Sequence, residues 1–352
     1  MKKKVLVGMS GGVDSSLAAA LLVEQGFQVV GVFIKVWEPE TSLWKGKCTS
    51  REDRLDAMRV AAVLGIELRT VDLSKEYEKE VIEYMVEEYK KGRTPNPDVM
   101  CNRKIKFGAF LQYAAKERAD YVATGHYARI KNNMLLKGID KNKDQSYFLW
   151  TLKKDDLKRI IFPVGRLKKE EVRELARKRG LPTADKKDSQ GLCFVGQLDL
   201  KGFLKSRIKQ CEGTVLNEKG KIMGKHEGAF FYTIGERHGF KIGNERQSNK
   251  PLYVVAKNMR KNTITVSAEP WRSSGAVAEI KLEETNWIIS KLVDGKKYHG
   301  VIRYRQAPQT IRLEILPRNK AKIVFEERQL ISPGQSLVVY DGNKCLGGGI
   351  IS

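Results

Sequence analysis

The first 35 residues constrain the fold more than any other part of the chain. The apolar run from Lys4 to Met9 is typical of a buried strand, and Val13, Leu17 and Leu21 then recur at helical spacing before Gly26. Residues 28–35 supply a second β-rich run. Strands joined by a helix in this way pair in parallel, with the helix covering one face of the sheet. The sequence therefore predicts an α/β fold that begins with a βαβ unit.

The same alternation continues to about residue 195. A second helix, with Leu55, Met58 and Ala62 on one face, is expected to precede Gly65, followed by a strand over 67–71, an acidic helix from near Ser74 and a strand over 121–124. We predict that residues 1–195 form an α/β domain built on a parallel sheet.

Beyond residue 195 helical periodicity fades and glycines multiply. Residues 228–234 and 252–256 are interpreted as short strands of a small middle domain over 196–270. Runs at 301–304, 310–316, 321–325 and 336–340 predict antiparallel strands that close into a small barrel or sandwich over 271–352.

The charge balance points to a polyanionic partner. The 352 residues include 65 Lys and Arg against 42 Asp and Glu, a net charge of +23. So large a surplus favours nucleic acid through counterion release, although a basic surface tuned for solubility is the alternative, and charge alone does not separate RNA from DNA. No apolar run approaches the ~18 residues of a membrane span, and the apolar run after the basic start is too short for a signal peptide. We expect a cytoplasmic protein.

The cysteines are five in number and widely scattered, which argues against both a disulfide framework and zinc knuckles. The four histidines include no pair at i, i+4 spacing, so a histidine-based metal site is not expected either. A cysteine with a special role in this chain is therefore expected to be a reactive one.

The loop between the first strand and the first helix has the composition of a phosphate cradle. Glycines and hydroxyl side chains in SGGVDSS let backbone amides and hydroxyls face an anion at a helix N-terminus. The loop has neither the lysine of a P-loop nor the glycine spacing of a dinucleotide fingerprint. The alternative is a glycine-rich turn with Ser10 as a helix cap. Asp14 is a candidate ligand for Mg²⁺ on a leaving pyrophosphate, or an acidic residue that complements the helix dipole.

Two cysteines lie in segments suited to thiolate chemistry. Cys101 follows the proline-stiffened TPNPDVM and precedes Arg103, Lys104 and Lys106, and Cys193 follows Lys186 and Lys187 in a glycine-containing loop. Nearby cations favour the thiolate, and two activated thiols can relay sulfur. The alternative for each is a small buried hydrophobic residue.

These segments resemble a known family from end to end. SGGVDSS is similar to the loop of the ATP pyrophosphatase superfamily. With this loop and seven further motifs, the chain resembles the bacterial and mitochondrial tRNA-specific 2-thiouridylases. The further motifs are GRTPNPDVMCNRKIKF, ATGHYARI, KDQSYFL, KKDSQGLCFVG, FYTIGERHGF, RYRQAP and YDGNKCLGGGII. The lack of a transit segment favours the bacterial type. Phe240 and Lys241 replace a leucine-glycine pair common in relatives.

The resemblance implies ATP-dependent 2-thiolation of the wobble uridine in a tRNA anticodon. ATP, with Mg²⁺, would adenylate the C2 oxygen, which is otherwise a poor leaving group. Cys193 would receive sulfur as a persulfide from a donor protein. Cys101 would be the nucleophile that completes transfer, forming a transient disulfide with Cys193, while Cys48, Cys211 and Cys345 would be bystanders. The implied partners are the tRNA anticodon stem-loop and the sulfur donor, with no membrane and no DNA.

The resemblance also assigns site residues. Asp98 would manage protons or form an Asx turn, His126 would touch tRNA or be a structural histidine, and Lys143 and Arg303 would hold tRNA or be solvated surface cations. The full assignment is Gly8, Met9, Ser10, Gly11, Gly12, Val13, Asp14, Ser15, Ile34 and Gly125 for ATP; Asn96, Pro97 and Asp98 for the target base; and His126, Lys143, Asp144, Gln145, Arg303, Tyr304 and Gln335 for tRNA.

Two rival functions fit part of the sequence. An ATP pyrophosphatase that adenylates a small molecule for ligation needs the loop but neither cysteine. A basic RNA-binding protein that uses ATP only as a conformational ligand would release no pyrophosphate.

Overall fold

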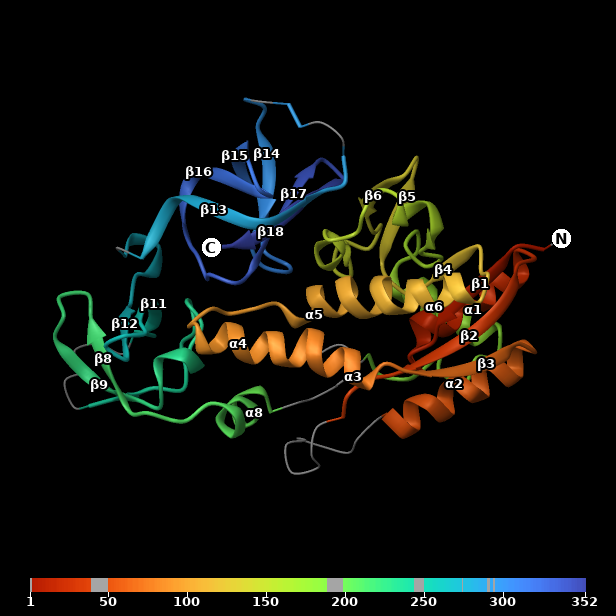
Figure 1. The fold of residues 1–352 in the computed structure, drawn as a ribbon, viewed down its shortest axis with the longest axis horizontal. Helices are drawn as coiled ribbons and strands as arrows, with labels where there is room; N and C mark the ends of the chain where they lie inside the picture. Colours follow the sequence, from red (N-terminus) through yellow and green to blue (C-terminus); the bar gives the residue numbers. More distant parts are fainter. Residues whose placement is uncertain are drawn as a thin grey trace.

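The structure is a computed structural model that describes residues 2–38, 50–188, 199–243, 250–273, 275–289, 292–293 and 295–352. It contains three sheets, one for each part of the chain distinguished above. In Figure 1 the α/β part, the middle part and the C-terminal barrel surround two long helical segments that run across the centre of the molecule.

The first sheet has the order β3-β2-β1-β4-β7, and every pair in it is parallel. The predicted α/β fold with a parallel sheet is confirmed. β1 pairs with β2 from Lys4 opposite Gln28 to Gly8 opposite Val32, so the loop after β1 emerges at the carboxyl edge of the sheet, where ligands of such folds bind. The strands are β1 (Lys4–Gly8), β2 (Gln28–Lys35), β3 (Glu67–Asp72), β4 (Tyr121–Ala123) and β7 (Ile160–Ile161).

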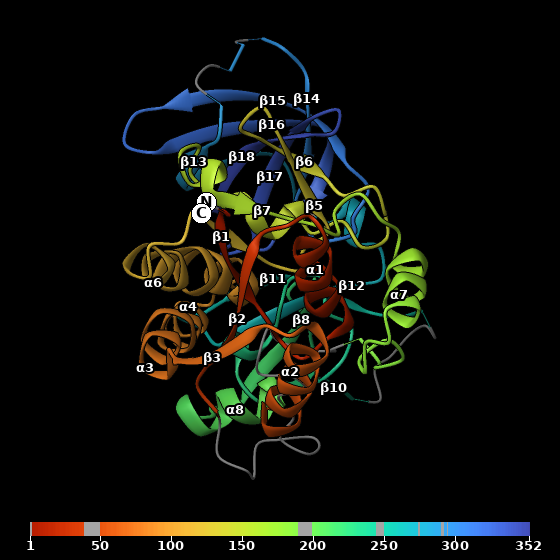
Figure 2. The same cartoon turned by 90° about the vertical axis from the view of Figure 1, so that its right-hand side faces the viewer.

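Helices cover both faces of this sheet (Figure 2). Alternate side chains of β1 point to opposite faces, so Val5 and Val7 pack in one core while Leu6 packs in the other. The first face carries α1 (Val13–Glu24), α2 (Ser50–Leu64) and α7 (Lys169–Lys178). The second face carries two unbroken helical stretches, one formed by α3 (Ser74–Tyr77), η2 (Glu78–Glu83) and α4 (Tyr84–Lys90), the other by α5 (Pro97–Met100), η3 (Cys101–Ala109) and α6 (Phe110–Lys116).

One predicted helix face is wrong. Leu55 and Met58 of α2 are 39% and 44% exposed, and Ala62 is exposed as well. The buried face consists of Ala57, Val60 and Ala61. The small alanines let the helix axis approach the sheet closely, whereas the larger side chains would hold it away. The size of an apolar side chain was therefore a poor guide to its burial here.

The middle part is a five-stranded sheet of order β10-β9-β8-β12-β11. The predicted strand over 252–256 corresponds to β11, but the one over 228–234 is wrong: Gly228, at φ 137°, leads into a short 3₁₀ helix, η6 (Ala229–Phe231). The remaining elements are α8 (Leu200–Arg207), β8 (Gly213–Asn217), β9 (Ile222–His226), β10 (Lys241–Ile242), β11 (Tyr253–Asn258), β12 (Thr263–Ser267) and η7 (Pro270–Arg272).

The C-terminal strands form the predicted antiparallel barrel, which β13 closes by pairing with β18. β14 ends at Val301, so the predicted strand over 301–304 lies three residues too late. The barrel strands are β13 (Ala276–Trp287), β14 (Tyr298–Val301), β15 (Gln309–Leu316), β16 (Lys320–Leu330), β17 (Ser336–Asp341) and β18 (Lys344–Ile351).

A hairpin from the α/β part extends the barrel sheet. β5 (Ala128–Lys131) and β6 (Met134–Lys137) pair with each other, and Leu136 of β6 lies opposite Lys344 of β18. The short helices η4 (Ser146–Leu149) and η5 (Asp156–Arg159) follow. The two parts of the chain are thus joined by a shared sheet as well as by side-chain packing. No helix within the described ranges is both long and apolar enough to cross a membrane.

Candidate functional site

The glycine loop after β1 is closely packed against two neighbouring segments. Gly11 has φ 73°, and a Cβ atom there would lie 2.2 Å from the carbonyl oxygen of Asp53. A Cβ on Gly125, which follows β4, would lie 2.6 Å from both Asp14 C and Ser15 N. Only glycine fits either position without movement of the backbone. The expected ATP-binding residues 8–15 and Gly125 are therefore brought together at the N-terminus of α1, whereas Ile34 lies buried near the end of β2.

The loop hydroxyls stabilise the loop itself. Ser15 Oγ donates to the carbonyl of Gly12 at 3.0 Å and accepts the Ser10 amide at 3.2 Å, and Ser16 Oγ donates to the same carbonyl at 2.9 Å. Gly12, not Ser10, is the N-cap of α1, and no side chain caps the helix. The alternative of Ser10 as an ordinary helix cap is not what the structure shows. The uncapped N-terminus leaves positive potential and backbone amides for an anion.

Asp14 is held by two side chains that the sequence analysis did not single out. Tyr127 Oη donates to Asp14 Oδ1 at 2.7 Å, and Lys169 Nζ donates to the two carboxylate oxygens at 2.7 and 2.8 Å. Burial and the Asp14 charge raise the pKa of Tyr127 well above its usual value. Lys169 is therefore a cation partner of this carboxylate, and the role of Asp14 as a Mg²⁺ ligand stays a prediction. No group of three potential metal-ligating side chains occurs among the described residues.

Lys169 also contacts Asp188, the last described residue before the segment that contains Cys193. Lys169 Nζ lies 2.9 Å from Asp188 Oδ1, and Lys143 and Arg173 contact the same carboxylate at 2.6 and 2.8 Å. Burial opposes ionisation of Asp188, but Lys143 and Lys169 lower its pKa to about 2. Lys143, expected at the tRNA surface, is thus an ion-pair partner in this cluster. Lys169 sits in a run of lysines and glutamates at the start of α7, and no sequence signal separated it from surface residues.

The segment expected to contact the target base begins a helical stretch, from Pro97 to Lys116. Asn96 caps it by accepting the Val99 amide at 3.2 Å, and Pro97 occupies its first turn. The carbonyl of Asp98 accepts Asn102 Nδ2 at 3.0 Å. Farther along the same stretch, a Cβ on Gly8 would lie 3.4 Å from Phe110. One helix therefore runs from the expected base-binding segment to the nucleotide loop.

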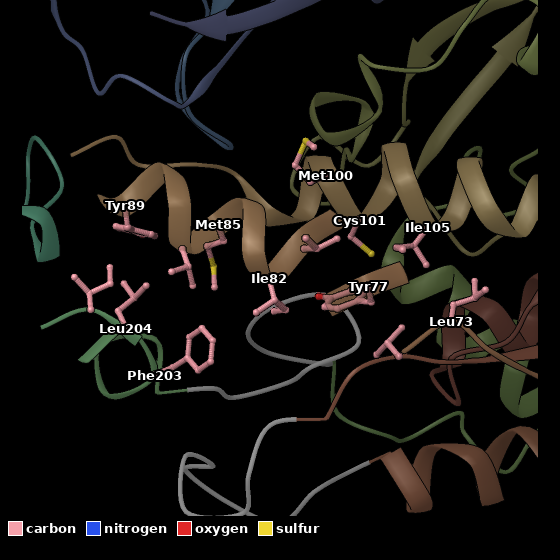
Figure 3. Packing of buried hydrophobic residues seen from close by; sticks show 14 of the residues in the cluster. Leu73, Tyr77, Ile82, Met85, Tyr89, Met100, Cys101, Ile105, Phe203 and Leu204 are labelled. Carbon is pink, nitrogen blue, oxygen red and sulfur yellow. The ribbon is translucent and has the colours of Figure 1, made fainter. Parts of the chain in front are cut away.

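Cys101 lies at the start of the π-helical segment η3, fully buried. Figure 3 shows it above Tyr77 and beside Ile105 in an apolar cluster. The cations expected to activate it have other partners: Arg103 pairs with Glu284 at 2.7 Å and Lys104 with Glu80 at 2.6 Å. Lys106, the third of these cations, has its Nζ 3.4 Å from His126 Nε2, and the activation of the thiol by any of the three stays a prediction. Cys193, the other half of the expected relay, lies outside the described residues.

His126 has the surroundings of a packed internal histidine. It is 5% exposed, its Nδ1 lies 2.7 Å from Thr124 Oγ1, and its Nε2 lies 3.4 Å from Lys106 Nζ. The rings of Phe107 and Phe162 flank it, each with its centroid 5.8 Å away. Burial and Lys106 lower its pKa well below 6.5. These contacts favour the structural alternative over direct contact with RNA.

The other residues expected to touch tRNA fall into two groups. Asp144 and Gln145 organise the turn before η4: Asp144 accepts the amides of Gly138 and Ser146, and Gln145 exchanges hydrogen bonds with the backbone of Tyr127. Arg303, Tyr304 and Gln335 come from the barrel and lie toward the expected base-binding segment.

Gln335 and its neighbours hold the backbone just before Asn96. Gln335 Nε2 donates to the carbonyls of Thr94 and Pro95, and the Thr94 amide donates to the carbonyl of Pro333 at 2.7 Å. Thr94 Oγ1 donates to Thr233 Oγ1 of the middle part at 3.3 Å. The backbone of residues 94–95, just before the expected base-binding segment, is therefore fixed by hydrogen bonds from both the barrel and the middle part.

Arg303 and Tyr304 line the space beside this backbone segment. Tyr304 packs on Phe148, with ring centroids 4.5 Å apart, and Arg303 donates to the carbonyl of Ile234 at 2.8 Å. Arg303 is half-buried, and burial lowers the pKa of its guanidinium. Together with Lys250 and Arg272 it lines a cavity of about 700 Å³ between the middle part and the barrel. Glu269, which lies 3.8 Å from Arg272, lines the same cavity.

Three family models match the chain in sequence order. They are described as the tRNA methyl transferase HUP domain over residues 3–197, the tRNA methyl transferase PRC-barrel domain over 201–268 and the aminomethyltransferase beta-barrel domain over 277–351.

Curated relatives match over nearly the full length. Proteins named tRNA-specific 2-thiouridylase MnmA are 42% identical in Bacillus subtilis, 45% identical in Shewanella sp. MR-7 and 44% identical in Listeria monocytogenes. In each case 99% of this chain is covered, together with 94%, 96% and 94% of the relative. The resemblance seen in the motifs is therefore confirmed at the level of the whole chain. The protein belongs to the tRNA-specific 2-thiouridylase family.

Proposed function

We propose that this enzyme replaces the C2 oxygen of the wobble uridine of tRNA with sulfur, with ATP as the activating substrate and Cys101 and Cys193 as the sulfur relay. The observation that carries the proposal is the helix from Pro97 to Lys116. It joins the expected base-binding segment, Cys101 and a contact with Gly8 of the nucleotide loop. A uridine held near its first turn and an ATP held at the loop would meet along one rigid element.

ATP makes the C2 oxygen a leaving group. The oxygen attacks the α-phosphate, a bond to phosphorus forms, and pyrophosphate departs with the electrons of the cleaved phosphoanhydride. The loop amides at the uncapped N-terminus of α1 face the site where phosphate charge develops, which is the arrangement that lowers such a barrier. Magnesium would accompany the phosphates as part of the substrate, and no step here depends on a protein-bound metal.

Sulfur then replaces the activated oxygen. The terminal sulfur of a Cys193 persulfide bonds to C2, and AMP leaves with the former uridine oxygen. The Cys101 thiol attacks Sγ of Cys193, which breaks the sulfur–sulfur bond, leaves the thiocarbonyl on the base and joins the two cysteines in a disulfide. A cellular thiol reductant must then restore both thiols. Burial of Cys101 among apolar side chains would exclude water from this step.

The RNA is expected to enter between the middle part and the barrel. The net charge of +23 favours an RNA backbone, and the cavity lined by Lys250, Arg272 and Arg303 is the place where cations from both domains meet. Tyr304, packed at a tilt against Phe148, offers an aromatic surface for an unpaired base of the anticodon loop. Because the anticodon loop is single-stranded, the target base is extruded at lower cost than from a duplex.

The test is Cys101→Ser in the full chain, with Cys211→Ser as the matched control because Cys211 is exposed and distant in sequence from the site. The tRNA is incubated with ATP and a low-molecular-weight persulfide, which carries sulfur at the oxidation level that the Cys193 persulfide needs, and its nucleosides are analysed by mass spectrometry. We expect 2-thiouridine with the wild type and the control and none with Cys101→Ser. Thiouridine formation by a folded Cys101→Ser variant would refute the proposed relay.

The two rival functions give different results in the same experiment. A small-molecule ligase forms AMP without tRNA, and neither cysteine substitution affects it. A non-catalytic RNA-binding protein forms no AMP at all. We expect AMP to form only when tRNA is present.

A further inference from the structure

Lys169 is a buried cation shared by two carboxylates from opposite ends of the α/β part. Its side chain is 9% exposed. Its ammonium lies 2.7 and 2.8 Å from the oxygens of Asp14, in the first turn of α1, and 2.9 Å from Asp188. An ammonium has three hydrogens, and these contacts use all of them.

The two carboxylates differ in what else they contact. Asp188 also has Lys143 and Arg173, at 2.6 and 2.8 Å. Within the described part of the chain, the side chain of Asp14 contacts the neutral hydroxyl of Tyr127 besides Lys169. The backbone amide of Lys169 donates to Asp140 at 3.0 Å, which fixes the start of α7 at this point. Lys169 is thus the cation that balances the negative charge of the Asp14 carboxylate.

Asp14 stands next to the place where ATP phosphates are expected. It is two residues beyond Gly12, the N-cap of α1, and Gly125 packs against its backbone. An unneutralised carboxylate here would repel the phosphates and oppose the favourable potential of the helix N-terminus.

We propose that Lys169 is a positioning residue for ATP binding: it anchors and neutralises Asp14, so that the loop at the start of α1 receives phosphate without an opposing charge behind it. On this view Asp14 is the ion-pair partner of Lys169 and not a magnesium ligand. This inference rests on the proposed function, because it takes ATP as the ligand of the loop.

The inference predicts that the effect of Lys169 depends on the charge of Asp14. Removing the ammonium in Lys169→Met exposes the phosphates to one uncompensated charge, and we expect the Kd for ATP to rise roughly 10- to 50-fold. In an Asp14→Asn background the same substitution should change the Kd less than about threefold, since Asp188 keeps two other cations. A lysine that bound phosphate directly would lose the same affinity in both backgrounds.

The experiment measures ATP binding by titration calorimetry at constant Mg²⁺ and salt, with the full chain and with thermal unfolding recorded for every variant. The variants are Lys169→Met, Asp14→Asn and the double substitution. Lys178→Met is the control, because Lys178 lies on the same helix in an exposed pair with Glu174 and should bind ATP as the wild type does.

Equal losses of affinity from Lys169→Met in both backgrounds would overturn the inference, as would unchanged affinity in the single variant. If the single variant does not fold, the comparison of Asp14→Asn with the double variant decides: equal affinities support the inference, and a tenfold loss refutes it. Wild-type protein that binds no ATP would instead refute the proposed function itself.

Discussion

Gly125 packs so closely against the start of α1 that an added methyl group should displace the nucleotide loop. In Gly125→Ala the Cβ would lie 2.6 Å from Asp14 C and Ser15 N, both backbone atoms, and 3.0 Å from Asp14 Cβ. Ordinary contacts of a Cβ begin near 3.4 Å. The end of β4 and the first turn of α1 must therefore separate by about 0.8 Å, the difference between these two distances.

The magnitude follows from the rigidity of both elements. Overpacking of this kind destabilises a fold by about 1–3 kcal/mol. A displacement near 1 Å of groups that position a substrate reduces the rate by about 10²-fold. We therefore expect Gly125→Ala to weaken ATP binding by at least about tenfold, while the protein remains folded.

The assay is ATP titration together with chemical denaturation of the same samples. Gly243→Ala is the matched control: its Cβ would meet only the carbonyl of Met223, at 3.7 Å, and both its stability and its ATP affinity should stay close to the wild type. Wild-type ATP affinity in Gly125→Ala would refute the argument that the close approach of Gly125 positions the loop.

Three further predictions concern the ion pairs and the RNA surface. Arg93 contacts Glu88 at 2.8 Å and Glu283 of β13 at 2.5 Å, and Glu88 keeps Lys91 at 2.9 Å when Arg93 is removed. Arg93→Met should therefore destabilise the protein by about 1–2 kcal/mol in denaturation, whereas the exposed Lys90→Met should change stability by less than about 0.5 kcal/mol. Equal effects would contradict the role of this interdomain pair. In the folded protein the pKa of Asp188 is lowered from 3.8 to about 2, so its stabilisation is present above about pH 4 and is lost as the pH falls toward 2. After allowance for solvent screening, Asp188→Asn should be less stable than the wild type by about 1 kcal/mol at pH 6. In acid titrations followed by circular dichroism, this difference should vanish near pH 2. Arg303→Met should weaken tRNA binding and reduce by about 1 the slope of the logarithm of the binding constant against the logarithm of the salt concentration. Arg318→Met should leave that slope unchanged. An unaltered slope for Arg303→Met would show that this residue is not part of the RNA-binding surface.

The elements that local pattern specifies were predicted well. The residues of β1 and β2 form continuous apolar runs, and the glycine loop between β1 and α1 has a composition that few other structures require. The barrel strands β15 and β17 agree with the predicted runs to within one residue, because alternation of side chains along a strand is a local property, whereas β16 continues five residues beyond the predicted run over 321–325. Local pattern predicted the wrong buried face for α2, and a strand where the 3₁₀ helix η6 lies. In both places the packing partner determines which side chains are buried.

The sequence by itself determined the fold class, the nucleotide loop and the family, because each depends on residues adjacent in the chain or on motifs that span it. The tertiary structure alone decided that Lys169, 155 positions from Asp14, neutralises that carboxylate, that the β5–β6 hairpin extends the barrel sheet, and that Gln335 supports the backbone before Asn96. A charge or an amide acts over a few ångströms, whatever the separation along the chain. Which groups lie within that distance is settled only when the sheets and helices have packed.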